Sequence, residues 1–224
     1  MMIRNRLLSL LYRIAAFGIA VWTCVLVGAE NQSLFFGYFS VQSQLITTIA
    51  FGLLIIFNFI DLLRHGIHGV PAGIWMPVSL AFLCYSFVTG TVGNVYAFFG
   101  LSYSLNVILV QIVVPILFLV DWILFEEKGT VKWWHAFYWM IFPSFYLAFI
   151  FIRPKIWPNT EFTLLGKASP YPYDIIDPNA HGWTQVLLVS LAAVFAFFLV
   201  GLVLIFFNNL MAGRFRRRGP ELKA

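Results

Sequence analysis

Six long apolar segments constrain what this chain can fold into more than any other feature of its sequence. They cover residues 7–28, 38–60, 75–98, 104–125, 133–152 and 183–207. A helix rises about 1.5 Å per residue and the hydrocarbon core of a bilayer is about 30 Å thick, so about 20 apolar residues cross it. The sequence therefore predicts an all-α protein, a polytopic membrane bundle of six transmembrane helices.

The composition supports this interpretation. Hydrophobic residues make up 61% of the chain and charged residues only 10%, and the mean hydropathy is +0.88. Soluble domains have a much larger charged fraction. Because the apolar segments take up most of the 224 residues, we expect one transmembrane domain over residues 1–213, with an outer loop at residues 153–182 and a basic cytoplasmic tail at residues 214–224.

The distribution of basic residues predicts the orientation. Of the 14 Lys and Arg residues, 11 fall on the side of the two termini and 3 on the opposite side. Since Lys and Arg accumulate in cytoplasmic loops, both termini are predicted to be cytoplasmic in a multi-pass protein of the cell membrane. The net charge of +5 then reflects topology, and no nucleic-acid partner is predicted.

Two charged residues fall inside predicted spans at matching depths. At about 1.5 Å per residue, Arg13 in the first span and Asp121 in the fourth lie roughly 7 to 9 Å above the inner boundary. A charge at this depth requires a partner or a water-filled cavity. We therefore predict a structural Arg13–Asp121 ion pair, the alternative being that the long Arg13 side chain reaches the cytoplasmic headgroups.

Polar side chains gather in the outer half of the predicted bundle. They are Ser40, Ser43, Gln44 and Thr47 in the second segment, Asn94 in the third, and Asn106 and Gln111 in the fourth. The first four have i, i+3, i+4, i+7 spacing and therefore share one helical face. Two interpretations remain open, because these groups can hydrogen-bond between helices or line a polar pocket.

The predicted outer loop is unusual in composition. Five prolines punctuate residues 153–182, and Trp157, Tyr171 and Tyr173 are interleaved with them. Proline restricts the backbone, so the loop is expected to be stiff enough to fold back as a cap over the pocket. The aromatic residues also suit the belt at the membrane interface, and the two interpretations are compatible.

Three motifs occur in order along the chain. They are Tyr-Phe-Ser-Val-Gln-Ser-Gln at residues 38–44, Val-Val-Pro at residues 113–115 with Asp121-Trp122, and Tyr-Pro-Tyr at residues 171–173 with Asp177 and Gly182. The first resembles the Tyr-Phe-Thr-x-Gln-Ser-Asn pattern of a bacterial family of six-span membrane proteins, Pr-six-Pr, and the others resemble that family too. The resemblance extends over nearly the whole chain.

That family is distantly similar to the androgen-induced six-span hydrolases, which cleave fatty-acid esters of hydroxy fatty acids with a threonine nucleophile and a histidine. The resemblance implies that Ser40 replaces the threonine and that Gln111 stands where the histidine is expected. Glutamine cannot take a proton from a hydroxyl group. His181, at the same level as Ser40, is therefore the remaining candidate for a catalytic base.

These observations leave three classes of function. The first is a lipid-ester hydrolase with Ser40, Gln111 and His181 as catalytic residues. The second is a non-catalytic protein that binds a lipid or supports a membrane partner, and a transporter ranks last because broken helices and intramembrane charges are few. Membrane lipids and a fatty-acid ester or another amphiphile are the predicted partners, and no cofactor or metal site is predicted.

Overall fold

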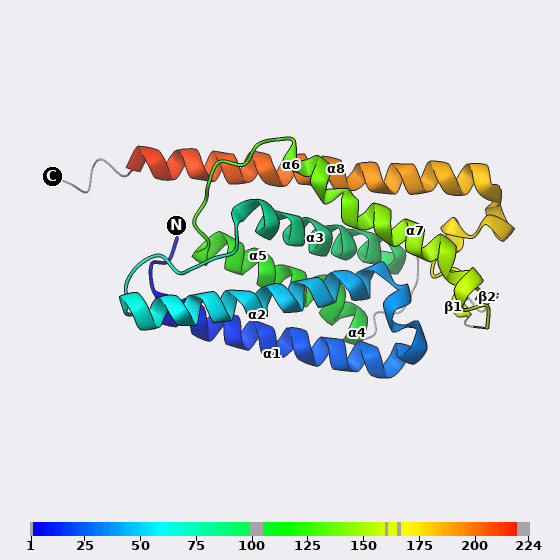
Figure 1. Ribbon diagram of the computed structural model, residues 1–224, viewed down its shortest axis with the longest axis horizontal. Coiled ribbons are helices and arrows are strands. Elements are labelled where there is room, and N and C mark those ends of the chain that lie inside the picture. The colour runs from blue at the N-terminus through cyan, green and yellow to red at the C-terminus, as the bar shows by residue number, and fades with distance from the viewer. Residues whose placement is uncertain (1, 99–104, 160, 165–166, 219–224) are drawn as a thin grey trace.

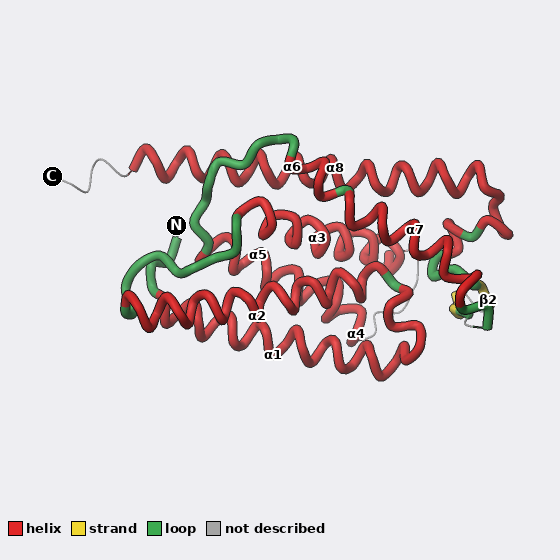
Figure 2. The backbone as a smooth tube through the Cα atoms, in the orientation of Figure 1, coloured by secondary structure: helices red, strands yellow, loops and turns green. Residues whose placement is uncertain are grey.

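The computed structural model describes residues 2–98, 105–159, 161–164 and 167–218, and most of them are helical. The long helices run roughly along the longest axis of the molecule (Figures 1 and 2). They are α1 (Arg6–Asn31), α2 (Phe39–His65), α3 (Met76–Phe98), α5 (Val114–Phe125), α7 (Ile141–Ile156) and α8 (Pro178–Arg218). The short helical segments are η1 (Gln32–Gly37), α4 (Leu105–Ile108), η2 (Leu109–Val113), α6 (His135–Trp139) and η3 (Asp174–Ile176).

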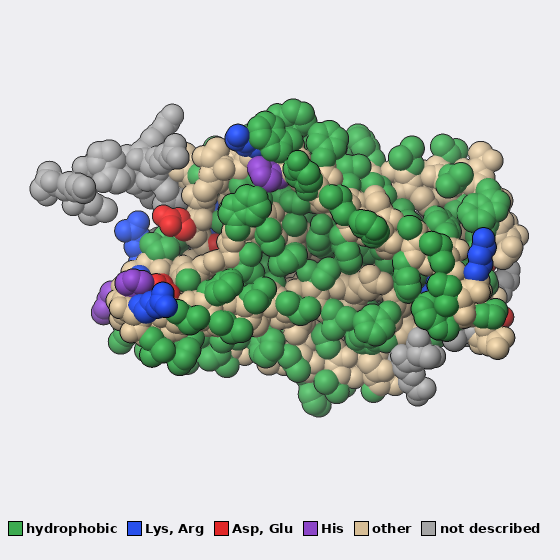
Figure 3. Space-filling model, viewed as in Figure 1, with side chains coloured by type: hydrophobic (Ala, Val, Ile, Leu, Met, Phe, Trp, Pro, Cys, Tyr) green, Lys and Arg blue, Asp and Glu red, His purple; other side chains and the backbone are tan. Residues whose placement is uncertain are grey.

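The two ends of the bundle differ in the secondary-structure elements and in the charged side chains that they carry. α1 begins and α2 ends on the left of Figure 1, which we call the terminal end. The opposite end, the loop end, carries strands β1 (Phe162–Leu164) and β2 (Lys167–Ser169), which pair as an antiparallel hairpin. In Figure 3 hydrophobic side chains cover the middle of the visible face, while charged side chains gather mainly at the terminal end.

The prediction of a helical membrane bundle is confirmed in its general form. Within the described residues, five helices are long and apolar enough to cross a membrane. They are Arg6–Glu30, Phe39–His65, Leu105–Phe125, His135–Ile156 and Pro178–Gly213. The apolar part of α3 described with its side chains, Met76–Thr91, is shorter. Many large apolar side chains of these helices are exposed, as expected where lipid is the solvent.

Proline explains why two predicted spans are not regular α-helices throughout. In the fourth, the π-helical turn η2 separates α4 from α5, and Pro115 follows it without an N–H for the carbonyl of Gln111 four residues earlier. In the fifth, α6 and α7 meet at Met140, and Pro143 has no N–H for the carbonyl of Trp139. Both breaks therefore lie where an i→i+4 hydrogen bond is missing.

The outer loop predicted at residues 153–182 is shorter in the structure. α7 continues through Arg153 and Pro154 to Ile156, because proline removes only one hydrogen bond near the end of a helix. α8 begins at Pro178, which suits the first turn of a helix, but the non-helical Gly182 separates this turn from the long helix that follows. His181, expected in the outer loop, lies in this short turn just before the long helix. The segment between these helices contains the hairpin and η3.

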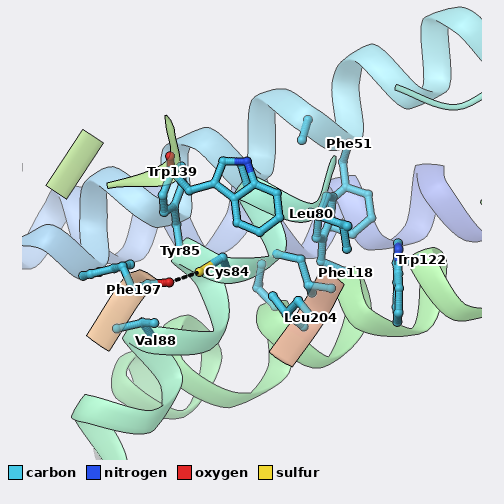
Figure 4. Close-up of a cluster of buried hydrophobic side chains, with 14 of the residues drawn as sticks. Phe51, Leu80, Cys84, Tyr85, Val88, Phe118, Trp122, Trp139, Phe197 and Leu204 are labelled. Atoms are coloured by element: carbon cyan, nitrogen blue, oxygen red, sulfur yellow. Dashed lines mark hydrogen bonds between the residues drawn. The ribbon is translucent and has the colours of Figure 1, made fainter. Parts of the chain in front are cut away.

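The central core is formed by side chains from α1, α2, α3, α5, α6 and α8, and Figure 4 shows part of it. The rings of Phe51 and Phe118 meet edge to face with centroids 5.3 Å apart. On the other side of the cluster, the thiol of Cys84 donates to the carbonyl of Phe197 at 3.5 Å, which ties α3 to α8. Cys24 and Cys84 are both free cysteines.

Helix α3 and the π-helical turn approach closely at Gly90. A Cβ added there would lie 2.5 Å from the carbonyl oxygen of Gln111 and 3.9 Å from Cγ of Pro115. Only a residue without a side chain leaves room for this backbone oxygen. The contact therefore depends on both Gly90 and the irregular turn that Pro115 favours.

Helix α8 is fixed differently at its two ends. Near the terminal end, Asn208 donates to the carbonyl of Gly129 at 2.6 Å. Asn209 accepts from the N–H of Val131 at 2.8 Å and donates to its carbonyl at 2.7 Å. At the loop end, Gly182 interrupts the helix with φ of 74°, a conformation that glycine adopts readily.

Candidate functional site

Ser40 lies at the loop end, in the first turn of α2, and is half-buried. The chain just before it is held by two tyrosines. The hydroxyl of Tyr146 donates to the carbonyl of Gly37 at 2.8 Å, and the hydroxyl of Tyr173 accepts from the N–H of Phe39 at 3.2 Å. Ser40 is therefore positioned by residues of α7 and of the segment before η3.

The polar stripe of α2 is used mainly for helix packing. Ser43, Gln44 and Thr47 are all buried. Gln44 donates through Nε2 to the carbonyl of Ala20 in α1 at 3.3 Å, and Thr47 donates to the carbonyl of Ser43 one turn earlier at 3.0 Å. The Gln44 contact is a hydrogen bond between helices, which is one of the two interpretations of the stripe, whereas the Thr47 contact lies within α2.

The remaining residues of the predicted pocket belong to other helices. Asn106 is half-buried in α4, and the side chain of Asn94 lies outside the described part of the structure. Gln111 lies within the π-helical turn η2. Its side-chain Oε1 is buried and has no hydrogen-bond partner among the described groups.

His181 has a carboxylate partner. Its Nε2 lies 2.9 Å from Oδ2 of Asp174, and 30% of the His181 side chain and 58% of the Asp174 side chain are exposed. Asp174 directly follows Tyr173, the residue that contacts Phe39. The His181–Asp174 pair thus lies on a segment adjacent to the first turn of α2, although no hydrogen bond to Ser40 is described.

An apolar groove lies beside this region, between α2 and α7. Its volume is about 560 Å³, and it is lined by Phe36, Gln42, Leu45, Ile46, Phe142, Phe145, Tyr146 and Phe149. Phe36 and Phe145 are 61% and 71% exposed, so the groove is open toward the surroundings of the bundle. Tyr146 connects it to the chain before Ser40. The groove is not lined by Ser43, Gln44, Thr47 or Asn106 of the predicted pocket.

At the terminal end, Arg13 and Asp121 form the predicted ion pair. Both side chains are fully buried, and Nε of Arg13 lies 2.9 Å from Oδ1 of Asp121. A second guanidinium nitrogen donates to Oδ2 at 3.2 Å, and a third donates to the carbonyl of Ala72 at 2.6 Å. Arg13 is therefore engaged inside the protein and does not extend to the headgroups.

At the same end of the bundle, two buried charged residues were not predicted to be buried. Glu126 is 1% exposed and Lys128 is 8% exposed, and both lie just beyond the end of α5. Burial raises the pKa of Glu126 to about 7, with a further contribution from Asp121, whereas burial lowers the pKa of Lys128 to about 8. Their position after an apolar segment gave no signal of burial, because such residues normally face water.

Nearby, Arg6 of α1 closes the terminal end against α2. Nε of Arg6 lies 2.5 Å from Oδ2 of Asp61, and Oδ1 of Asp61 lies 2.6 Å from Nδ1 of His65. Arg6 also donates to the carbonyl of His68. Within the part of the chain that is described, no three His, Cys, Asp or Glu residues are grouped so that they could hold a metal ion.

Comparison of the chain with protein-family models, with curated proteins and with solved structures finds no match.

Proposed function

We propose that this chain is a six-span protein of the cell membrane that binds a lipid-like amphiphile at its loop end. The 23 residues of α3 are long enough, at about 1.5 Å per residue, to serve as the sixth span. The excess of Lys and Arg at the terminal end supports cytoplasmic termini. The loop end then faces the outer leaflet.

The groove between α2 and α7 is the observation that carries this proposal. An acyl chain is flexible and apolar, and an open groove of about 560 Å³ with six apolar or aromatic side chains besides Gln42 and Tyr146 offers it a matching surface. Such a chain would enter from the surrounding lipid. The polar head of the amphiphile would then lie beside Gln42 and the first turn of α2, near the backbone groups that Tyr146 and Tyr173 contact.

Filling the groove tests the proposal. We expect Leu45→Trp to remove the lipid that copurifies with the protein in mild detergent, because the larger ring occupies the volume of an acyl chain. Mass spectrometry of extracted lipid, normalised to protein, is the measurement. Leu191→Trp is the matched control, since Leu191 is 68% exposed on α8. An equal lipid content in wild type, Leu45→Trp and Leu191→Trp would contradict the proposal.

A second candidate function, a lipid-ester hydrolase, is favoured by the His181–Asp174 pair. A carboxylate beside a histidine orients the ring and stabilises its protonated form. In this mechanism, Oγ of Ser40 attacks the ester carbonyl while His181 takes its proton and passes it to the leaving alcohol. Water then hydrolyses the acyl-enzyme with the same base. Gln111 has no proton-accepting role and would only orient polar groups.

Labelling of membranes with a fluorophosphonate probe tests the hydrolase. We expect labelling of the wild type to be lost in Ser40→Ala, which lacks the nucleophile, and strongly reduced in His181→Ala, which lacks the base. Ser43→Ala is the control, because Ser43 is buried one turn further along the same helix and should leave labelling unchanged. Labelling that persists in Ser40→Ala would exclude this mechanism and leave the lipid-binding protein.

A further inference from the structure

Glu126 lies just beyond the last turn of α5, at the terminal end, and only 1% of its surface is exposed. The hydroxyl of Ser79, in the first turn of α3, donates to its Oε1 at 2.8 Å. Its Oε2 is buried and has no hydrogen-bond partner among the described groups. A single donor is little compensation for a buried negative charge, whereas a neutral carboxyl group costs much less to bury. The geometry therefore favours a protonated Glu126.

The ion pair near Glu126 does not supply a counter-ion for it. The three guanidinium nitrogens of Arg13, in α1, are all engaged, two with the Asp121 carboxylate and one with the carbonyl of Ala72. Asp121 also places a negative charge near Glu126, and this charge opposes a second one. The pair is therefore electrically complete without Glu126.

Lys128, two residues later in the chain, is the second basic group beside Glu126. Its ammonium group donates to the backbone carbonyls of Trp122 and Glu126 and lies 4.1 Å from the centroid of the Trp122 ring. In the described structure, no basic side chain forms an ion pair with the Glu126 carboxyl group. Because Nζ of Lys128 is already 3.1 Å from the backbone oxygen of Glu126, it needs only a short movement to reach the carboxyl group of the same residue.

A cavity of about 380 Å³ connects this region with water. Other atoms of Glu126 line the cavity, together with residues 70–74, Met76, Asp61 and Glu127. Asp61, from α2, is paired with Arg6, and Glu127 is exposed, so the lining adds no cation that would neutralise Glu126. A water molecule takes up about 30 Å³ of liquid, so the cavity can hold several. Rotation of the Glu126 side chain toward the cavity would let a proton pass to solvent.

The environment shifts the two side chains in opposite directions. Burial raises the pKa of Glu126 to about 7, and the charge of Asp121 adds to the shift. The folded protein therefore holds this proton on the order of a hundredfold more tightly than the unfolded chain does. Burial lowers the pKa of Lys128 to about 8. Lys128 is thus still charged when Glu126 loses its proton.

We propose that Glu126 is a proton-binding site that switches the contacts of the terminal end. With the proton bound, Ser79 and Glu126 join α3 to the segment after α5, and Lys128 holds the carbonyl of Trp122 in the last turn of α5. When the carboxyl group releases its proton to water, the ammonium group of Lys128 moves from the Trp122 carbonyl to the new carboxylate. The last turn of α5 then loses a contact. This switch is independent of the groove at the loop end, so either proposal can fail without the other.

The pH dependence of unfolding tests for the proton. The unfolded chain releases it near pH 4.5 and the folded protein near pH 7, so the stability of the wild type should fall as the pH rises between these values and then level off. Relative to Glu126→Gln, which imitates the protonated form at every pH, the unfolding equilibrium constant should rise by up to about tenfold per pH unit in this window. The measurement is equilibrium unfolding of the purified full chain in mild detergent.

The matched control is Glu127→Gln, the same change at the exposed neighbouring residue, which should keep the wild-type profile. A ratio of the unfolding constants of wild type and Glu126→Gln that is the same at about pH 5 and about pH 8 would overturn the proposal.

Two further measurements test the movement of Lys128. Hydrogen exchange of residues 122–128 should be faster in the wild type than in Glu126→Gln above about pH 7, and equal in both at about pH 5, because only the wild type releases the Trp122 carbonyl. In a Lys128→Met background, the same comparison with and without Glu126→Gln should place the midpoint of the stability change at a higher pH, since no ammonium group receives the carboxylate. Equal exchange in both proteins above about pH 7, or a midpoint that Lys128→Met leaves unchanged, would overturn the proposal.

Discussion

Replacing Asp121 with asparagine should destabilise the protein by about 3 to 5 kcal/mol, because the substitution leaves a buried Arg13 without its counter-ion. Both side chains are fully buried, and two guanidinium nitrogens contact the two carboxylate oxygens. An amide can replace a hydrogen bond but not the negative charge. The measurement is equilibrium or thermal unfolding of the purified protein in mild detergent.

A double variant separates the ion pair from the loss of a single group. Arg13→Met combined with Asp121→Asn should be more stable than Asp121→Asn alone, because no buried charge remains in the double variant. The coupling is disproved if the double variant is no more stable than the single one. As a control, Asp174→Asn removes a carboxylate that is 58% exposed, and its effect should stay within about 1 kcal/mol.

Adding one methyl group at Gly90 should destabilise the protein by about 1 to 3 kcal/mol through overpacking. In Gly90→Ala the new Cβ would lie 2.5 Å from the carbonyl oxygen of Gln111. This oxygen belongs to the backbone and cannot rotate away as a flexible side chain would. Relief therefore requires α3 and the π-helical turn to move apart, which also loosens the packing around Pro115.

Gly18→Ala is the matched control for Gly90→Ala. No heavy atom lies within 4 Å of a Cβ added at Gly18 in α1, so only helix propensity changes there. Alanine should stabilise that helix by up to about 1 kcal/mol. Opposite signs for the two glycines in the same unfolding assay would support the close contact, whereas similar stabilisation by both would contradict it.

The hydropathy of the segments, and the depth of charged residues within the predicted spans, predicted the features that depend on lipid as a solvent. The segments 7–28 and 38–60 correspond to α1 and α2, although each helix is longer than its apolar part, since hydrogen bonding continues past the last apolar residue. Arg13 and Asp121 could be paired because each has few acceptable environments at its depth. Their contact is seen directly in the structure.

Other features depend on side-chain direction, which spacing alone does not determine. The stripe of Ser43, Gln44 and Thr47 was compatible with a pocket, but the face it shares is turned toward α1 and the helix backbone. The groove between α2 and α7 is lined mainly by apolar residues and therefore had no polar signal in the sequence. Glu126 and Lys128 are buried because residues distant in sequence cover them, and local composition does not encode this.

The breaks in the helices were only half predictable. Pro115 and Pro143 are visible in the sequence, but a proline within a span is compatible with a kink, a π-helical turn or a continuous helix. The outcome at Pro115 depends on Gly90 in another helix, which leaves room for the displaced carbonyl. A choice of this kind is made by tertiary packing.

The two attachments of α8 determine which part of that helix can yield first. At Asn208 and Asn209, side chains bind the backbone of Gly129 and Val131 much as a neighbouring strand would. At Gly182 the helix is interrupted by a residue with non-helical backbone angles instead. α8 is thus held by side-chain hydrogen bonds at one end and interrupted by Gly182 at the other. Movement of α8 away from the bundle therefore requires the hydrogen bonds of Asn208 and Asn209 to break. Gly129 and Val131 follow Glu126 and Lys128 in the sequence. Loss of these hydrogen bonds would therefore also free the backbone beside two buried charged residues.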